Sequence, residues 1–189
     1  TSDGGHDLRL RRSQGSDATV AAGWASTMVG LLEQTAPGNV RIDPGGWPLW
    51  RQLLPHVLAA AGHDAALDAA PAQATRLLDR AANYLIGSGE VQAAVAASEC
   101  AYEVRRDTFG DDHPDTLTSA SNLALNLWWL GEYKRARALD DDALARRRRV
   151  LGDDHPDTLT SASQLASNLL NLGEHLQARE LQEEMLSRG

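Results

Sequence analysis

The sequence has few of the residues that build β-sheets, disulfides or membrane spans. Only 5% of its 189 residues are aromatic, and Cys100 is the single cysteine. One cysteine excludes a disulfide within the chain and is compatible with a reducing compartment. No stretch approaches the roughly 20 apolar residues of a membrane span, and no signal peptide is apparent. These absences favour an all-α, cytoplasmic protein with no membrane partner.

Charge and motifs exclude further classes of function. The formal net charge is −8, and such a surface repels phosphates, so we expect no nucleic-acid partner. Neither a GxxxxGK[ST] phosphate-binding loop nor a GxSxG nucleophile motif occurs. Cys100 lies in an Ala-rich stretch that is typical of a buried small residue rather than an activated thiol. We therefore expect no catalytic site and no cofactor.

The strongest positive signal is an internal repeat. The segment GDDHPDTLTSAS occurs at 110–121 and again at 152–163, a period of 42 residues (152 − 110). After the proline of each copy, apolar or small residues recur at helical spacing, a Leu-Gly-Glu turn follows, and a second stripe resumes. Each unit is therefore predicted to be a helix, a tight turn and an antiparallel helix.

Three such units are expected. An earlier, degenerate copy is marked by Gly89 and Glu90, which lie one period before Gly131 and Glu132. One helix pair cannot bury its apolar stripe alone, so the pairs should stack into a right-handed α-superhelix, an α-solenoid with a concave face. The predicted units span about 71–110, 113–152 and 155–188.

Two further segments precede the array, which occupies 68–189. Residues 1–17 are polar and Gly-rich and indicate a flexible tail or linker. Residues 18–67 are predicted to form helices that pack on the array. Within them, Trp47 and Trp50 are candidates for stacking on a ligand, although tryptophan at such spacing is usually core.

Histidine beside several aspartates suggests a metal site, but capping explains more of the residues. The group around His113 recurs at His155, yet the EF-hand pattern is missing. In the alternative, Asp112 or His113 caps a helix, Pro114 takes its first position and Asp115 complements its dipole. We favour capping and expect no metal.

A run of arginines from Arg146 to Arg149 has two interpretations. The run is a candidate contact for an acidic partner or phosphate. However, Asp142 lies four residues before Arg146, and an exposed pair at this helical spacing is the ordinary interpretation.

The repeat resembles known families. Ala124, Gly131 and Ala136 match the small residue, the turn glycine and the early second-helix alanine of the tetratricopeptide repeat. The 42-residue form, with LGDDHPDTL at the junction, is similar to the repeats of kinesin light chain and of many bacterial proteins. Upstream, WPLWRQLLPHVLAAAG followed by RLLDRAANYLIGSGE resembles the junction in actinobacterial NB-ARC proteins, in which the repeats act as sensor of a nucleotide-binding module. This resemblance implies the sensor region of a signalling ATPase; a free-standing adaptor is the alternative.

The resemblance also implies which residues meet a partner, expected to be a protein or peptide segment. In tetratricopeptide arrays the first helix of each pair lines the groove, where Asn and Gln can hold an extended backbone. Trp128 and Trp129 are candidate anchors for an apolar side chain. Alternatively, one of them packs on the next helix pair and the polar residues face water. The predicted concave-face residues are Arg76, Arg80, Asn83, Thr118, Ser121, Asn122, Leu125, Trp128, Trp129, Gln164, Ser167 and Asn171.

Overall fold

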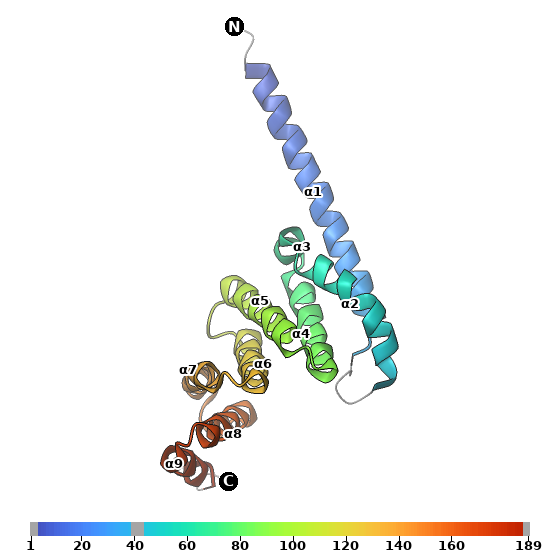
Figure 1. The fold of residues 1–189 in the computed structure, drawn as a ribbon. Coiled ribbons are helices and arrows are strands. Elements are labelled where there is room, and N and C mark those ends of the chain that lie inside the picture. The colour runs from blue at the N-terminus through green and yellow to red at the C-terminus, as the bar shows by residue number, and fades with distance from the viewer. Residues whose placement is uncertain (1–3, 39–43, 187–189) are drawn as a thin grey trace.

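The computed structural model describes residues 4–38 and 44–186, and within these ranges the protein is helical without strands. Each helix packs on the next along the chain, so the molecule is a row of helices (Figure 1). The predicted all-α solenoid is confirmed. The elements are α1 (Gly4–Thr35), the 3-10 helix η1 (Pro44–Gly46), α2 (Trp47–Ala61), α3 (Asp64–Ala69), α4 (Pro71–Ser88), α5 (Val91–Phe109), α6 (Pro114–Leu130), α7 (Tyr133–Leu151), α8 (Pro156–Asn171) and α9 (His175–Leu186).

Three antiparallel pairs form the array: α4 with α5, α6 with α7, and α8 with α9. The first two pairs turn at Gly89 and Gly131, which end α4 and α6 in the left-handed conformation with φ of 87° and 85°. Residues with a side chain are strained in the left-handed conformation, so a glycine at the end of the first helix lets the chain reverse within two residues. The predicted helix, tight turn and second helix are therefore present in each unit.

The connections between pairs also repeat. Gly110 ends α5 with φ 87° and ψ 166°, and Gly152 ends α7 with φ 90° and ψ 165°. Essentially only glycine occupies this region of backbone angles. His113 and His155 then cap α6 and α8. Their Nδ1 atoms accept hydrogen bonds from the backbone N–H two residues later, at 3.1 and 3.2 Å. The capping role is confirmed, with the histidine as the cap.

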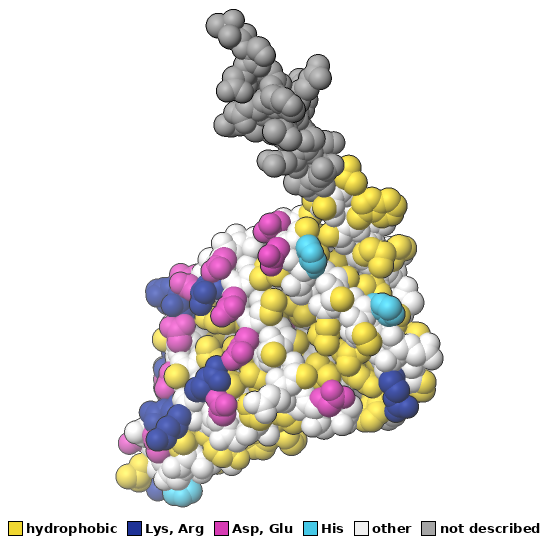
Figure 2. Space-filling model, turned by 45° about the horizontal axis from the view of Figure 1, so that its top comes forward, with side chains coloured by type: hydrophobic (Ala, Val, Ile, Leu, Met, Phe, Trp, Pro, Cys, Tyr) yellow, Lys and Arg dark blue, Asp and Glu magenta, His cyan; other side chains and the backbone are white. Residues whose placement is uncertain are grey.

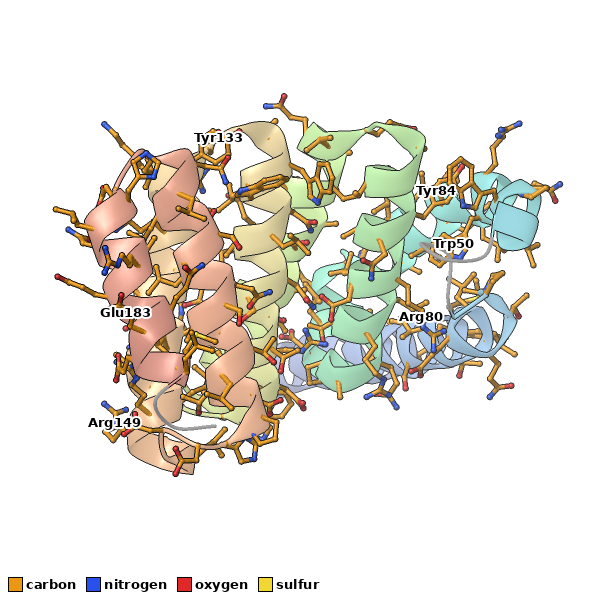
Figure 3. All side chains as sticks on the ribbon, turned by 90° about the horizontal axis from the view of Figure 1, so that it is seen from below. Trp50, Arg80, Tyr84, Tyr133, Arg149 and Glu183 are labelled. Atoms are coloured by element: carbon orange, nitrogen blue, oxygen red, sulfur yellow. The ribbon has the colours of Figure 1, made fainter. Side chains whose placement is uncertain are left out.

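The N-terminal helices pack on the first pair through an aromatic cluster. Trp50 of α2 is fully buried and stacks on Tyr84 of α4, with ring centroids 5.7 Å apart. Its Nε1 donates to the carbonyl oxygen of Pro37 at 3.0 Å. Trp47 meets the same tyrosine edge-on at 6.1 Å. Figure 3 shows Trp50 beside Tyr84. Both tryptophans therefore belong to the core and are not free to stack on a ligand.

The helix α1 differs from the sequence-based expectation. It begins at Gly4, whereas a tail was predicted up to residue 17; residues 1–3 lie outside the described part. No proline interrupts this stretch, and adding residues to a helix that is already nucleated costs little. The helix projects from the array (Figure 1).

Part of α1 exposes apolar side chains. Val20, Trp24, Met28 and Leu31 are all largely exposed, while Val29 on the other side is fully buried. Figure 2 shows hydrophobic side chains gathered next to the grey part of this helix. Among the described residues, no helix is both long and apolar enough to cross a membrane.

Candidate functional site

Two predicted groove residues of the first pair are engaged with α1. Arg76 Nε donates to Glu33 Oε1 at 2.6 Å. Arg80 Nη1 donates to the carbonyl oxygens of Glu33 and Ala36 at 2.8 and 3.4 Å, so it satisfies acceptors at the end of α1 that lack helical partners. Figure 3 shows Arg80 next to α1. Asn83 remains as the exposed candidate on α4.

Ser121 does not face the groove, and this prediction is corrected. Its side chain is buried, donates to the carbonyl oxygen of Leu117 at 3.3 Å and accepts from Arg147 Nη1 at 2.8 Å. The buried guanidinium of α7 needs acceptors, and it draws this serine into the interface between helices. Thr118 and Asn171 are exposed, but each donates to a carbonyl oxygen of its own helix at 2.8 Å.

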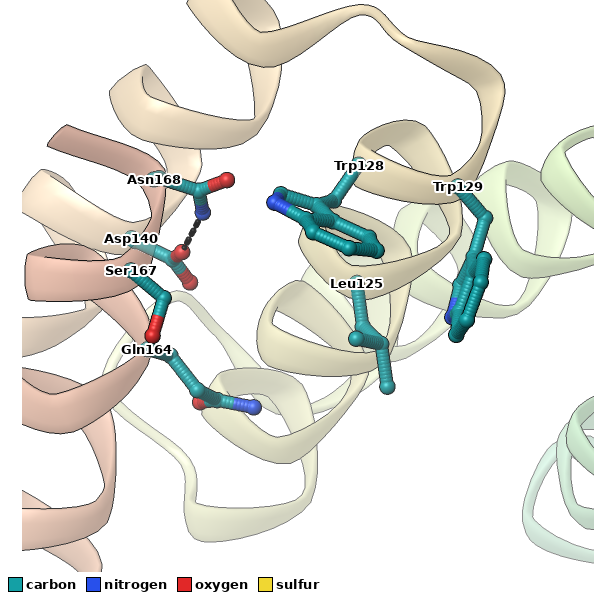
Figure 4. Close-up of a pocket in the computed structure, with 7 residues that line it drawn as sticks. All are labelled: Leu125, Trp128, Trp129, Asp140, Gln164, Ser167 and Asn168. Carbon is teal, nitrogen blue, oxygen red and sulfur yellow. Dashed lines mark hydrogen bonds between the residues drawn. The ribbon is translucent and has the colours of Figure 1, made fainter. Parts of the chain in front are cut away.

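The remaining predicted residues of α6 and α8 largely converge on one pocket of about 290 Å³. Asn122 lies outside it, one repeat before Gln164. Figure 4 shows the pocket between Trp128 and Leu125 on one side and Gln164 and Asn168 on the other. Its lining residues are Leu125, Trp128, Trp129, Asp140, Gln164, Ser167 and Asn168.

The two tryptophans contribute differently to the pocket. Trp128 is half-buried and meets Trp129 edge-on, with ring centroids 5.0 Å apart and planes at 89°. A second edge contact, at 6.2 Å, joins it to Tyr133. Trp129 is 53% exposed. The aromatic contacts hold Trp128 as a fixed wall, whereas Trp129 forms an open rim.

Asp140 and Asn168 complete the pocket and were not among the predicted residues. Asp140 comes from α7, is 1% exposed, and its Oδ2 accepts from Asn168 Nδ2 at 2.5 Å. Burial raises the pKa of Asp140 to about 7, although the hydrogen bond from Asn168 and the positive charge of Arg147 act in the opposite direction. No cation among the described residues lies within ion-pairing distance of this carboxylate.

The sequence contained a signal for Asp140. The predicted groove residues came from the first helix of each pair, whereas Asp140 lies on α7, the second helix of its pair, in a run of three aspartates. One repeat earlier, Ser98 stands at the position of Asp140, whereas the position of Asn168 holds the same residue type, Asn126. The units therefore differ at this position, while the asparagine that donates a hydrogen bond to it is the same in both.

Four buried polar atoms around the pocket have no hydrogen-bond partner within the described chain. Native proteins pair nearly all such atoms, so a group of unpaired ones is unusual. One is a donor and three are acceptors. They are Trp128 Nε1, Asp140 Oδ1, Gln164 Oε1 and Asn168 Oδ1.

The other candidate sites are occupied by structural contacts. Arg146 Nε contacts Asp142 at 2.6 Å, as predicted, and Arg149 contacts Asp112 at 2.5 Å, so the arginine run is not a free basic patch. In the described ranges, no three His, Cys, Asp or Glu side chains gather in a way that would hold a metal ion. Burial raises the pKa of the Cys100 thiol, which opposes thiolate formation.

A profile of the tetratricopeptide repeat matches residues 75–115, 116–157 and 158–189. The chain belongs to the tetratricopeptide repeat family. Members of this family generally act as scaffolds for protein–protein interaction rather than as catalysts. No curated protein matches the chain.

Solved structures show the same fold at low identity. One structure contains TPR-like repeats of the kinesin light chain type from Podosopora anserina, which are nearly identical to one another. It is 22% identical to this chain, with a TM-score of 0.63, and the match covers 86% of this chain and 72% of that chain. A single-residue variant of that protein is also 22% identical to this chain. Its TM-score is 0.65, and the match covers 97% of this chain and 92% of that chain. BtubC (BKLC) from P. vanneervenii is 18% identical to this chain. Its TM-score is 0.68, and the match covers 94% of this chain and 72% of that chain. At these identities the likeness concerns the fold.

Proposed function

We propose that this tetratricopeptide array binds a protein or peptide segment along α6 and α8, at the pocket around Trp128. The supporting observation is the coincidence of a half-buried tryptophan, a leucine and four unpaired polar atoms in one concave place. Apolar walls with a few convergent polar groups are typical of binding sites. A bound segment would supply the missing hydrogen-bond partners and bury Trp128 completely.

A selection from a displayed peptide library tests this proposal. Peptides enriched on the wild-type chain should lose most of their binding to Trp128→Ala, because buried aromatic anchors contribute disproportionately to binding. Trp24→Ala is the matched control, since Trp24 is 68% exposed on α1, outside the pocket. Peptides that bind both variants as well as the wild type would rule out the pocket as the binding site.

A finer proposal is that the array is the sensor region of an NB-ARC-type ATPase. The resemblance of the segment around α2 supports it, as does the packing of α2 on α4 through Trp50 and Tyr84. Through this contact, an occupied array would alter how α2 meets an upstream module. A free-standing adaptor is the alternative. A phosphate-binding loop encoded upstream of Thr1 in the same open reading frame supports the sensor; a start codon next to Thr1 supports the adaptor.

A further inference from the structure

The unpaired atoms of the pocket define the chemistry of the group that would satisfy them. Three of the four are acceptor oxygens, and one of these belongs to the carboxylate of Asp140. A ligand group with several N–H donors and a positive charge matches this set. An acidic side chain would be repelled, and a purely apolar one would leave the buried oxygens unpaired.

The walls of the pocket restrict the ligand further. Leu125 and Trp128 present apolar surface beside Asp140, which suits a chain of methylene groups that ends in a cation. The lysine ammonium has three donors and no acceptor, equal to the three unpaired oxygens, and a cation beside tryptophan gains additional attraction. Arginine carries a wider planar fork that is suited to bidentate pairing.

The preceding repeat lacks this arrangement. One repeat earlier, Ser98 stands at the position of Asp140 and Ile86 at that of Trp128. There Ser98 Oγ accepts from Asn126 Nδ2 at 2.6 Å, so a hydroxyl stands where the later repeat has the carboxylate. The scaffold therefore does not require a carboxylate at this position.

We propose that the pocket between α6, α7 and α8 receives a lysine side chain of the bound segment, with its ammonium group at Asp140 and its carbon chain against Leu125 and Trp128. This inference rests on the proposed binding function. Asp140 lies at the base of the pocket, and the ammonium group reaches its Oδ1 by a rotation of the half-buried Gln164 side chain. Trp128 Nε1 is then available to a carbonyl oxygen of the same segment.

The test compares short peptides that differ in one side chain. The indole N–H signal of Trp128 is followed by two-dimensional NMR during titration with acetyl-Gly-Ser-Lys-Ser-Gly-amide and with its norleucine, arginine and acetyl-lysine counterparts. We expect the lysine peptide to bind about tenfold more tightly than the norleucine and acetyl-lysine peptides, a preference near the lower limit of the coupling energies measured for close charge pairs. Binding of the arginine peptide as tightly as the lysine peptide would overturn the assignment to lysine.

Two variants separate the role of Asp140 from general charge and from folding. Asp140→Asn retains an acceptor for Asn168 but removes the charge, and it should abolish the preference for lysine over norleucine. Asp141→Asn removes the neighbouring exposed charge and should retain the preference. Circular dichroism melting checks that both variants are folded. A preference that persists in Asp140→Asn would overturn the inference.

The outcomes also separate this inference from the proposed function. If library-selected peptides shift the Trp128 signal but the lysine peptide shows no advantage, the pocket binds a segment of different chemistry and only the lysine inference fails. If selected peptides bind without shifting that signal, both proposals fail.

Discussion

The two junctions between helix pairs share one backbone plan but place their charges differently. At the first, formed by α4, α5 and α6, the buried Arg105 pairs with Asp79 through Nη1 and Oδ2 at 2.7 Å. At the second, formed by α6, α7 and α8, the equivalent Arg147 donates, among the described residues, to the hydroxyls of Ser121 and Ser161 and not to a carboxylate. The carboxylate of the second junction is Asp140, which lies on the same helix as the arginine but faces the pocket.

The difference lies in the partners of the buried charges and not in the backbone plan. At the first junction the carboxylate and the guanidinium satisfy each other. At the second, Asp140 and Arg147 are both buried and have no ion-pair partner among the described residues. Burial accordingly raises the pKa of Asp140 and lowers that of Arg147. Unpaired buried charge costs stability, and under the proposed function it leaves Asp140 available to a partner.

Removing the carboxylate of the first junction should have the largest effect on stability. Asp79→Ala leaves the buried Arg105 without a counter-ion, which typically costs about 3–5 kcal/mol. Urea denaturation measures the loss. Asp79→Ser is the matched control, because Ser121 holds the equivalent position and accepts from Arg147. The serine variant should lose clearly less; equal losses would show that a hydroxyl does not satisfy a buried arginine in this array.

Giving the second junction the residue of the first should increase stability in a pH-dependent way. Asp140→Ser removes a carboxyl whose folded-state pKa is raised from 3.8 to about 7. The wild type is therefore favoured at low pH and loses stability as pH rises from about 4 to 7, because the unfolded state releases this proton more readily.

The gain from Asp140→Ser should thus be small at pH 4 and up to about 4 kcal/mol at pH 8, since the pKa rises from 3.8 to about 7 on folding and one pKa unit corresponds to about 1.4 kcal/mol. Urea midpoints of both proteins at a series of pH values provide the measurement. The difference between the two proteins isolates Asp140 from the other titrating groups. A gap that does not change with pH would contradict the buried, unpaired carboxylate.

The glycine connections should show that the backbone plan is common to both junctions. Gly110→Ala and Gly152→Ala each place a side chain at φ near +90°, so each should cost about 1–3 kcal/mol. No atom lies within 4 Å of the added Cβ in either case, so the cost arises from the backbone alone. Thermal denaturation should give similar losses, and a large difference between them would indicate that the connections are not equivalent.

The smallest expected effect concerns the histidine caps. His113→Ala and His155→Ala remove the acceptor for one backbone N–H at the start of α6 and α8, which typically costs about 1 kcal/mol. Asparagine at the same positions should restore most of the stability, because it is a favoured capping residue. Failure of asparagine to do so would indicate that the imidazole ring acts through packing.

Local features of the chain were predictable because each depends on a few neighbouring residues. The helix pairs follow from apolar spacing, and their ends follow from glycine and from the His-Pro caps. The predictions that failed depend on partners distant in the sequence. Ser121 was assigned to the groove by its position in the repeat, but Arg147 binds it in the interface. The length of α1 exceeded the expectation because a helix extends from a packed nucleus into a stretch without strong signals.

The sequence alone determined the repeating unit, its period and the stacking of three pairs, because an apolar stripe at helical spacing must be buried by the next pair. Only the tertiary structure decided which residues form the pocket. Leu125 and Trp128 come from α6, Asp140 from α7 and Gln164 from α8. Their convergence depends on how the pairs pack, which the order of residues does not show. The same holds for the unpaired state of Asp140, because no cation of the described residues lies across that interface within ion-pairing distance.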